Sequence, residues 1–454
     1  MKSKFVLVLT VLVVAFSAVS QLRAAEDDAG LLDDTKELFK QIQLFADSIT
    51  LISTDYVEPV KAKDLVYGAI RGMMDTLDGY SQFLDPESFQ EITEETKGEF
   101  AGIGIEVGVR ENILTVIAPI EDTPAAKAGM EAGDKIVKID GKITRDMTLD
   151  EAVELLRGKP GTEVVITVIR ERTEEVLDFK IKRDIIKLKS ISQSRIIEED
   201  IAYMKIEEFQ ERTARDLRGN IKRLREEGAR SLIIDVRNNP GGLLNASVES
   251  ADEFLPSGAL IVYTEGRDPE KRTEFKSKKR SDFDDLELVV IVNKGSASAS
   301  EIFAGAIKDN KRGLVLGEMT FGKGSVQTVI PLKDKSALRL TTSAYFSPSG
   351  KSIREKGIEP DIYVKREYPD KKKQDKKPEQ EKVERLFSKV KSEEGPDEEK
   401  AEEEDKTDEK KIDPLLLEDN QLHAAVNILK GMGIFESYKT SGRSDADQNE
   451  QSEE

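Results

Sequence analysis

The nearly continuous apolar run from Leu286 to Val292 ends in a glycine–serine turn, and the alanine-rich segment Ala297–Asp309 follows it. Such a run is typical of a buried strand, and the segment after it has the composition of a helix. The same alternation occurs earlier in the chain, where we expect strand, helix and strand at Ile201–Phe209, Thr213–Glu227 and Ser231–Val236. This β–α–β order predicts a sheet flanked by helices, with ligands bound at the carboxyl ends of its strands.

Ser298 and Lys323 are the candidates for catalysis in this part of the chain. Ser298 is expected near the N-terminus of the alanine-rich helix, with its hydroxyl at the edge of the sheet. Lys323 lies between two glycines in a later loop, which could bring its amine back to that hydroxyl. A lysine with its ordinary pKa near 10.4 is a poor base at neutral pH, so desolvation has to lower the pKa by roughly 3 units. Phe321 and Val326 are the expected apolar neighbours of the amine.

The same residues also have a purely structural interpretation. Ser298 with Glu301 three positions later fits a capping box, in which the serine satisfies amide donors at the start of a helix. A lysine between two glycines is commonly a solvated loop residue. Spacing alone does not separate this interpretation from a serine nucleophile with a lysine base.

Composition excludes several classes of function. The chain of 454 residues has no cysteine, which excludes thiol catalysis and cysteine-based metal sites. Its single histidine, His423, lies beyond a long charged segment, so a Ser-His-Asp triad is not expected and the base of a serine hydrolase must be lysine or a carboxylate. The net charge of −19 argues against nucleic acid as a partner, because nucleic-acid binding needs a basic surface.

The N-terminus has the features of an export signal. Lys2 and Lys4 precede the apolar run Phe5–Val19, which predicts a secretory signal over residues 1–24 and a periplasmic location in a bacterium. The run is short for a membrane span of about 20 residues, and a retained inner-membrane anchor is the alternative. Residues 25–95 then show helical periodicity. We expect an amphipathic helical layer there, with a role in packing or dimerisation.

From Gly98 onward the pattern changes to short β-rich runs separated by glycines. The order of strands and helices over residues 96–185 resembles a PDZ domain. This resemblance implies that the backbone amides of one loop bind the C-terminal carboxylate of a peptide. The peptide would add as a strand beside Ile105–Val107, and one of its side chains would enter a pocket backed by the helix Leu149–Leu156. The loop consists of Gly102, Ile103, Gly104 and Ile105. The structural alternative is that these glycines only make a tight turn.

Three later segments, Asp235–Gly242, Gly295–Glu301 and Gly322–Gln327, follow one another in the order and spacing of a protease family. With the PDZ-like module upstream, residues 40–365 resemble the C-terminal processing peptidases, which are tail-specific serine proteases. The resemblance implies that Ser298 is the nucleophile, that Lys323 is the general base and that Gln327 orients the lysine.

The same resemblance implies the groups that support this pair. Backbone amides of Gly241 or Gly242 and of Ala299 would form the oxyanion hole. Asp309 matches an acidic position of the family as a supporting residue. Gln327 is neutral, so it can hydrogen-bond an amine without raising the pKa of that amine as a carboxylate would. No metal and no cofactor is required.

These features together predict an α+β multidomain chain with an N-terminal helical layer, a PDZ domain and a β/α sheet-and-helix Ser-Lys protease domain. Helical periodicity resumes from Pro414 to Leu429, and we expect this helix to dock on the N-terminal helices. The charged run before it predicts disorder or a solvated helix. The expected divisions are residues 1–24 (signal peptide), 25–95 (helical region), 96–185 (PDZ domain), 186–365 (protease domain), 366–411 (charged linker) and 412–454 (C-terminal helix and acidic tail).

The predicted function is that of an exported serine endopeptidase that recognises accessible C-terminal tails of proteins or peptides and cleaves through an acyl-enzyme. A homodimer through the N-terminal and C-terminal helices and a tether to the inner membrane are further expectations. The alternative is a catalytically silent PDZ scaffold in the cell envelope, although neither Ser298 nor Lys323 is substituted. A third hypothesis, an apolar-ligand binder on the same fold, would not need Lys323 or Gln327.

Overall fold

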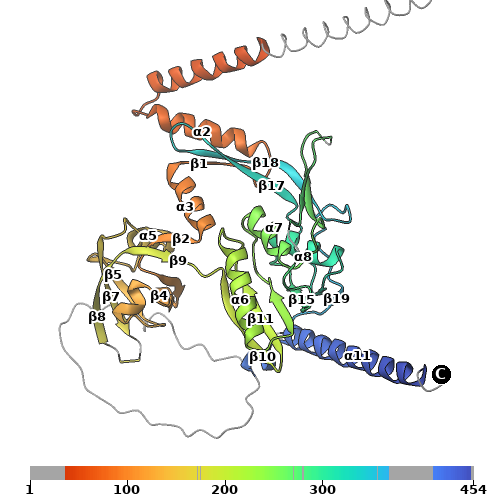
Figure 1. Ribbon diagram of the computed structural model, residues 1–454. Coiled ribbons are helices and arrows are strands. Elements are labelled where there is room, and N and C mark those ends of the chain that lie inside the picture. Colours follow the sequence, from red (N-terminus) through yellow and green to blue (C-terminus); the bar gives the residue numbers. More distant parts are fainter. Residues whose placement is uncertain are drawn as a thin grey trace, which may run out of the picture. The chain divides into compact units, whose positions relative to one another are not determined.

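Figure 1 shows the computed structural model of the chain, which describes residues 36–367, apart from 171, 174, 269, 279, 280 and 355, and residues 413–450. The chain divides into two compact units, Met1–Asp85 with Val329–Leu340 and Pro86–Thr328 with Thr341–Glu454. The predicted signal segment, residues 1–24, and nearly all of the predicted linker, residues 366–411, lie outside the described residues. Among the described residues, no helix is both long enough and apolar enough to cross a membrane.

The first unit combines helices with a short antiparallel strand pair. A helix spans residues 36–55, and α2 (Ala62–Asp75) follows it. Strand β1 (Gln82–Leu84) pairs with the start of β18 (Ala337–Phe346), and Phe83 belongs to a small buried cluster there. The helical periodicity predicted for this region is therefore confirmed in these two helices. Strand β1 was not predicted, because three residues are too few to show an alternating pattern.

The PDZ-like region contains an antiparallel sheet with the order β3-β4-β5-β7-β8. Helices α4 (Pro124–Ala128) and α5 (Leu149–Leu156) pack their apolar side chains into its core. In the described part of the chain no strand pairs with the outer side of β3, so β3 is an edge strand. The strands are β3 (Ile105–Arg110), β4 (Ile113–Pro119), β5 (Lys135–Ile139), β7 (Glu163–Arg170) and β8 (Glu175–Lys182), with β6 (Lys142–Ile143) beside β5 and a separate pair, β2 (Glu99–Gly102) with β9 (Asp184–Lys187).

The protease-like region is built around a six-stranded sheet with the order β10-β11-β12-β15-β16-β19. Strand β10 is antiparallel to β11, and the other neighbours are parallel. Helices α6 (Thr213–Glu226), α7 (Leu244–Asp252) and α8 (Ala299–Asp309) pack on one face, which confirms the predicted β–α–β order. The strands are β10 (Ile191–Glu198), β11 (Ile201–Ile206), β12 (Ser231–Asp235), β15 (Glu287–Val292), β16 (Leu314–Gly317) and β19 (Ile362–Tyr363).

Four further elements, three strands and one helix, complete this part of the chain. Strand β13 (Leu260–Glu265) pairs with β14 (Thr273–Lys276) and with the end of β18. Strand β17 (Ser325–Pro331) also pairs with β18 and begins directly after the loop of Lys323. Helix α3 (Pro86–Lys97) leads into β2. The lysine loop is therefore held between the parallel strand β16 and the separate strand β17.

The opposite face of the six-stranded sheet is covered by the C-terminal helices, α10 (Pro414–Glu418) and α11 (Asn420–Glu450). Successive side chains of a strand point to opposite faces, so Ile233 packs against these helices while Ile234 faces α6 to α8. Leu422 is completely buried in this second core. The prediction that this helix docks on the N-terminal helices is wrong, because its apolar side chains are buried against the protease-like sheet.

Candidate active site

Ser298 lies at the turn between strand β15 and helix α8, at the carboxyl end of the strand. Its backbone angles are φ 54° and ψ −112°, a combination that L side chains rarely adopt. Strain of this kind costs about 1–3 kcal/mol and persists where the surrounding structure enforces it, often at functional sites. A sharp strand-to-helix turn with a strained serine is also how hydrolases of other folds expose a nucleophile.

The two neighbouring serines have structural partners. The Ser296 hydroxyl donates to the carbonyl of Val236 at 2.7 Å, and the Ser300 hydroxyl donates to the carbonyl of Asn239 at 3.0 Å. Both serines are completely buried, whereas Ser298 is half-buried. Local geometry therefore separates Ser298 from the other two serines of the segment, independently of any family pattern.

The predicted capping box is present at the start of α8. The amide of Ser298 donates to Oε2 of Glu301 at 2.8 Å, while the amide of Glu301 donates to the main-chain carbonyl of Ser298 at 2.9 Å. The Glu301 carboxylate does more than cap the helix, because it also accepts the Thr320 hydroxyl at 2.6 Å, the Gly322 amide at 2.6 Å and the Lys323 amide at 2.9 Å.

This shared carboxylate brings the serine turn and the lysine loop together. The amide nitrogens of Ser298 and Lys323 both bind Oε2 of Glu301, at 2.8 Å and 2.9 Å, so they lie no more than 5.7 Å apart. Glu301 is completely buried, and burial raises the pKa of its carboxyl group, whereas the four hydrogen bonds act in the opposite direction. The sequence indicated the cap but not the three bonds to the loop, whose donors are distant in sequence.

The lysine loop is also fixed from its other side. A Cβ atom on Gly324 would lie 2.2 Å from the backbone nitrogen of Arg354, so only glycine fits beside Lys323. Lys323 is half-buried, and Val326 packs against the main core. The expectation that Phe321 shields the amine is wrong, because 59% of Phe321 is exposed to solvent.

Gln327 follows on strand β17 and is oriented by Ser325. Its amide nitrogen donates to the Ser325 hydroxyl at 2.7 Å and to the Ser325 carbonyl at 3.2 Å. Ser325 is itself nearly buried. This arrangement leaves the amide oxygen of Gln327 as an acceptor for an amine.

The backbone amides that are candidates for the oxyanion hole come from the Gly241–Gly242 turn and from Ala299, the residue after Ser298. A Cβ atom on Gly241 would stand 2.8 Å from Cβ of Ser298, so the glycine permits a close approach. The Gly241 amide donates to Oδ1 of Asn239 at 2.9 Å. Within the described residues, the amides of Gly242 and Ala299 have no such acceptor. Ala299 also starts α8, where the helix dipole favours negative charge.

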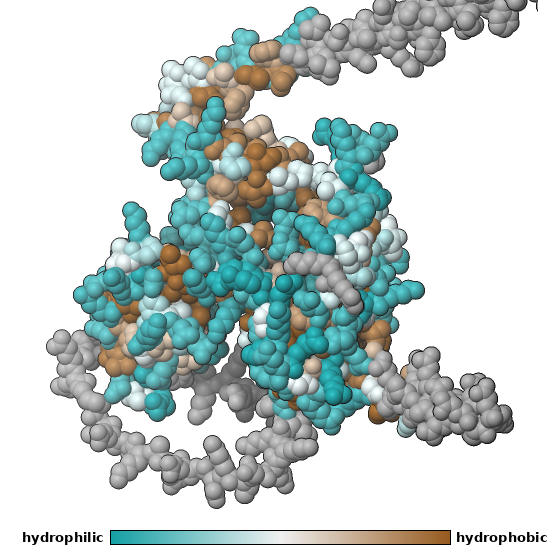
Figure 2. Space-filling view, in the orientation of Figure 1, coloured by the Kyte–Doolittle hydropathy of each residue, from teal (hydrophilic) through white to brown (hydrophobic). Residues whose placement is uncertain are grey.

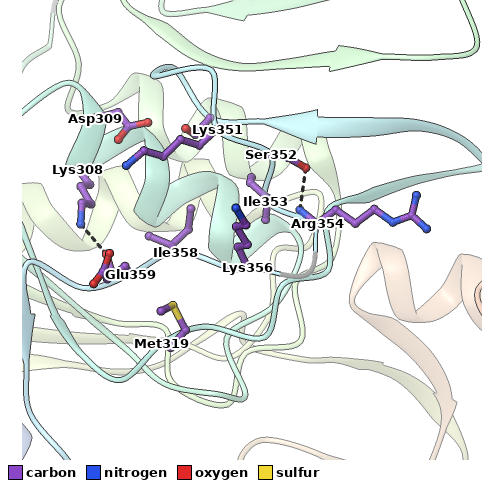
Figure 3. A pocket seen from close by; sticks show the side chains of 12 residues that line it. Lys308, Asp309, Met319, Lys351, Ser352, Ile353, Arg354, Lys356, Ile358 and Glu359 are labelled. Atoms are coloured by element: carbon purple, nitrogen blue, oxygen red, sulfur yellow. Dashed lines mark hydrogen bonds between the residues drawn. The ribbon is translucent and has the colours of Figure 1, made fainter.

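Asp309 lies at the opposite end of α8, about 16 Å from Ser298 along a helix of this length. Its carboxylate accepts the amide of Ser349 at 3.0 Å. Asp309 lines a pocket of about 560 Å³ with an apolar floor that includes Ile353 and Ile358 (Figure 3). Asp309 therefore supports a loop rather than touching the serine. In the described part of the chain no group of His, Asp or Glu side chains is arranged to hold a metal ion.

The predicted carboxylate loop of the PDZ-like region is a constrained turn beside an edge strand. Gly104 has φ +81°, and a Cβ atom there would lie 2.3 Å from Cβ of Thr123. Ile103 is buried, while Ile105 and Val107 are half-buried on β3. The Gly104 carbonyl accepts the Thr123 hydroxyl at 3.0 Å, which fixes the turn that follows Gly102. An edge strand next to helix α5 is the arrangement that strand addition by a peptide requires.

Three parts of the chain match known families. Residues 200–364 match peptidase family S41, residues 115–170 match the PDZ domain, and residues 13–88 match the N-terminal domain of the activating protease CtpB. The carboxy-terminal-processing protease of Bartonella bacilliformis is 43% identical over 345 residues, which are 75% of this chain and 79% of that protein.

Two further matches have similar extent. The carboxy-terminal processing protease CtpB of Bacillus subtilis is 36% identical over 319 residues, which are 70% of this chain and 66% of that protein. Among solved structures, the photosystem II D1 C-terminal processing protease has 28% sequence identity and a TM-score of 0.44, and the match covers 71% of this chain and 92% of that one.

Proposed function

This chain belongs to peptidase family S41, the carboxy-terminal processing proteases, and from that premise we propose that it is an exported endopeptidase that binds protein C-termini and cleaves with Ser298 and Lys323. As a member of the family it is a serine-type peptidase with a PDZ domain. The observation that supports the catalytic pair most is the Glu301 carboxylate, which binds the amides of both residues.

In the proposed mechanism, the neutral amine of Lys323 removes the proton from the Ser298 hydroxyl, whose oxygen attacks the scissile carbonyl carbon. The Gly242 and Ala299 amides stabilise the negative oxygen that forms, and Lys323 then protonates the leaving amine. Water, activated by the same amine, hydrolyses the acyl-enzyme. The amide oxygen of Gln327 accepts a hydrogen bond from Lys323 and holds it in place. Each proton transfer is assigned to a side chain, so the proposal invokes neither metal nor cofactor.

One experiment distinguishes the protease proposal from the alternative of a catalytically silent scaffold. An unstructured protein with an apolar C-terminal tail is incubated with the wild type and with the Ser298→Ala and Lys323→Ala variants. We expect cleavage by the wild type alone, with binding retained by both variants. Binding without cleavage by the wild type, or equal cleavage by Ser298→Ala, would show that the chain acts as a scaffold or that another residue is the nucleophile.

Tail recognition is proposed for the edge strand β3 and the loop Gly102–Ile105. A free C-terminal carboxylate would bind the loop amides, and the apolar terminal side chain would lie between β3 and α5. The substrate above with an amidated C-terminus is the test. We expect KM to rise at least tenfold, and an unchanged KM would refute recognition of the free carboxylate.

The proposal of export rests on the first 24 residues, in which Lys2 and Lys4 precede the apolar run Phe5–Val19. We propose a periplasmic enzyme with a cleaved signal, and a retained segment would make it a tethered enzyme of the inner membrane. N-terminal sequencing of the protein from periplasmic and membrane fractions separates the two. A protein found only in the cytoplasm with its N-terminus intact would contradict both.

A homodimer through the terminal helices is also proposed, with the first helix as its main support. Leu38, Phe39 and Leu44 on the helix of residues 36–55 are 59%, 66% and 62% exposed, and Figure 2 shows hydrophobic side chains gathered on this segment. Exposed apolar surface of this kind marks interaction sites. Light scattering of the wild type and of Phe39→Asp is the test, with a dimer expected to become a monomer. A monomeric wild type would refute it.

A further inference from the structure

The C-terminal helices reach the candidate oxyanion loop through one buried ion pair. Arg237 directly precedes the turn Asn238–Gly242. Its guanidinium binds Asp235 on one side and Asp419, from the C-terminal segment, on the other. The two bonds to Asp419 are 3.0 Å from Nη1 to Oδ1 and 2.7 Å from Nη2 to Oδ2. The side chains of Arg237 and Asp419 are only 10% and 7% exposed, so this pair is little screened by solvent.

Asp419 also caps the N-terminus of helix α11, which starts at the next residue. Its Oδ1 accepts the amides of Gln421 at 3.1 Å and Leu422 at 3.0 Å, as the N-cap residue of a helix does. Nη1 of Arg237 also donates to the side-chain oxygen Oε1 of Gln421 at 2.9 Å. One carboxylate therefore starts the helix and holds the arginine at two points. A bidentate pair fixes the orientation of the guanidinium plane as well as its position.

The segment after Arg237 is joined directly to the serine turn. The carbonyl of Asn239 accepts the Ala297 amide at 3.0 Å and the Ser300 hydroxyl at 3.0 Å. Gly241 approaches Ser298 so closely that a Cβ atom there would clash with it. A shift of the arginine would thus move the amides that are proposed to hold the oxyanion.

We propose that Asp419 is a positioning residue for the oxyanion loop and acts through Arg237. The docked C-terminal helix is then part of the catalytic machinery, although a long stretch of chain separates it from the protease-like sheet. This inference rests on the proposed function. It goes beyond packing, because packing alone would make Asp419 important for stability and not for the chemical step.

The chain offers a control in Asp413, which pairs with Arg195, whereas Asp419 pairs with Arg366 as well as with Arg237. Its carboxylate also caps a helix, accepting the Leu415 amide at 3.0 Å, and also binds an arginine twice, Arg195 at 2.9 Å and 3.2 Å. Arg195 lies on the edge strand β10 and does not lead into the oxyanion loop. Asparagine is a good N-cap, so Asp419→Asn and Asp413→Asn keep both helix starts. Each variant removes the negative charge and replaces one acceptor oxygen of the arginine by an NH₂ group.

The experiment compares both variants with the wild type in the full chain. Cleavage of the tail-bearing protein gives kcat and KM, and a fluorophosphonate probe gives the rate at which Ser298 is modified, which also depends on the oxyanion hole. For Asp419→Asn we expect kcat and the probe rate to fall about tenfold or more, with KM within about twofold. For Asp413→Asn we expect kcat, KM and the probe rate to stay within about twofold. Circular dichroism and thermal unfolding establish that each variant is folded.

Two outcomes would overturn the inference. One is a folded Asp419→Asn variant with the kcat and probe rate of the wild type. The other is an equal loss of activity in both variants that follows the loss of stability. If Asp419→Asn does not fold, Arg237→Lys keeps the charge and loses the bidentate geometry, and the same loss of kcat is expected. A wild type inactive toward substrate and probe would instead refute the proposed function.

Discussion

Replacing Glu301 by glutamine tests whether one buried carboxylate holds the serine turn and the lysine loop together. Its Oε2 accepts the amides of Ser298 and Lys323, at 2.8 Å and 2.9 Å, and its Oε1 accepts the Thr320 hydroxyl and the Gly322 amide, both at 2.6 Å. A glutamine side chain has only one oxygen. With its NH₂ group at the Oε2 position, the glutamine would face the amides of Ser298 and Lys323 and lose both bonds. With the NH₂ group at the Oε1 position it would lose the bond from Gly322, while the Thr320 hydroxyl can reverse and accept.

The expected magnitude follows from these contacts. A hydrogen bond to a charged group contributes about 1.5–3 kcal/mol, and the loss of one or two such bonds is partly offset because a neutral side chain is easier to bury than a carboxylate. We expect the free energy of unfolding to fall by about 3 kcal/mol. We also expect kcat to fall about hundredfold, the effect of displacing reacting groups by about 1 Å, because Ser298 and Lys323 lose their common anchor.

Glu253→Gln is the matched control for this change. Glu253 is also a buried glutamate of the protease-like region, and it accepts two bonds from Arg218 at 2.7 Å and 2.8 Å. None of its contacts reaches Ser298 or Lys323, so its loss should lower stability and leave kcat within about twofold. Denaturant unfolding and cleavage of the tail-bearing protein measure the two effects. A folded Glu301→Gln enzyme with kcat within threefold of the wild type would refute the anchoring role.

Three further results are expected. In the proposed mechanism Gln327 binds Lys323, so Gln327→Glu should favour the charged form of the lysine and move the pH profile of kcat/KM to higher pH; an unmoved profile would contradict the proposed contact. Gly104→Ala forces a Cβ atom to 2.3 Å from Cβ of Thr123, so tail binding should weaken while kcat on a short tail-less peptide stays constant; unchanged tail binding would contradict the loop assignment. Burial raises the pKa of Glu301 above 4.5, so the folded state binds more protons than the unfolded state, and the stability of the wild type relative to Glu301→Gln should decline as pH rises from about 4.5; an increase with pH would contradict the sign.

Features encoded in a short stretch of sequence could be predicted well. The helix expected at Leu149–Leu156 has those bounds in the structure, and the helix expected at Thr213–Glu227 ends one residue earlier. The strand expected at Ser231–Val236 is also found, ending at Asp235. Each of these elements has its own apolar period and its own turn or capping residue, so its neighbours in sequence suffice to define it.

Features that depend on a distant partner were missed. Strand β1 exists because it pairs with Leu338 and its neighbours, far away in the chain. The apolar face of the C-terminal helix could be seen in the sequence, but an apolar face does not specify what it packs on, and the N-terminal helices were the wrong choice. Phe321 was expected to line an apolar pocket for the lysine amine because it is apolar and near in sequence, but 59% of it is exposed to solvent.

The candidate site shows why the two interpretations of its central serine could not be separated from spacing. A Ser-x-x-Glu pattern predicts a helix cap, and Glu301 does bind the amide of Ser298. The same carboxylate also fixes the Lys323 loop, and its bond to Ser298 helps to hold a backbone with φ 54° that would otherwise relax. The glutamate half of the cap binds the main-chain amide of Ser298, so this half places no demand on the serine hydroxyl. Capping and catalysis are therefore compatible roles for one turn, and in the proposed mechanism the buried acid that shapes the turn also determines where the base must lie.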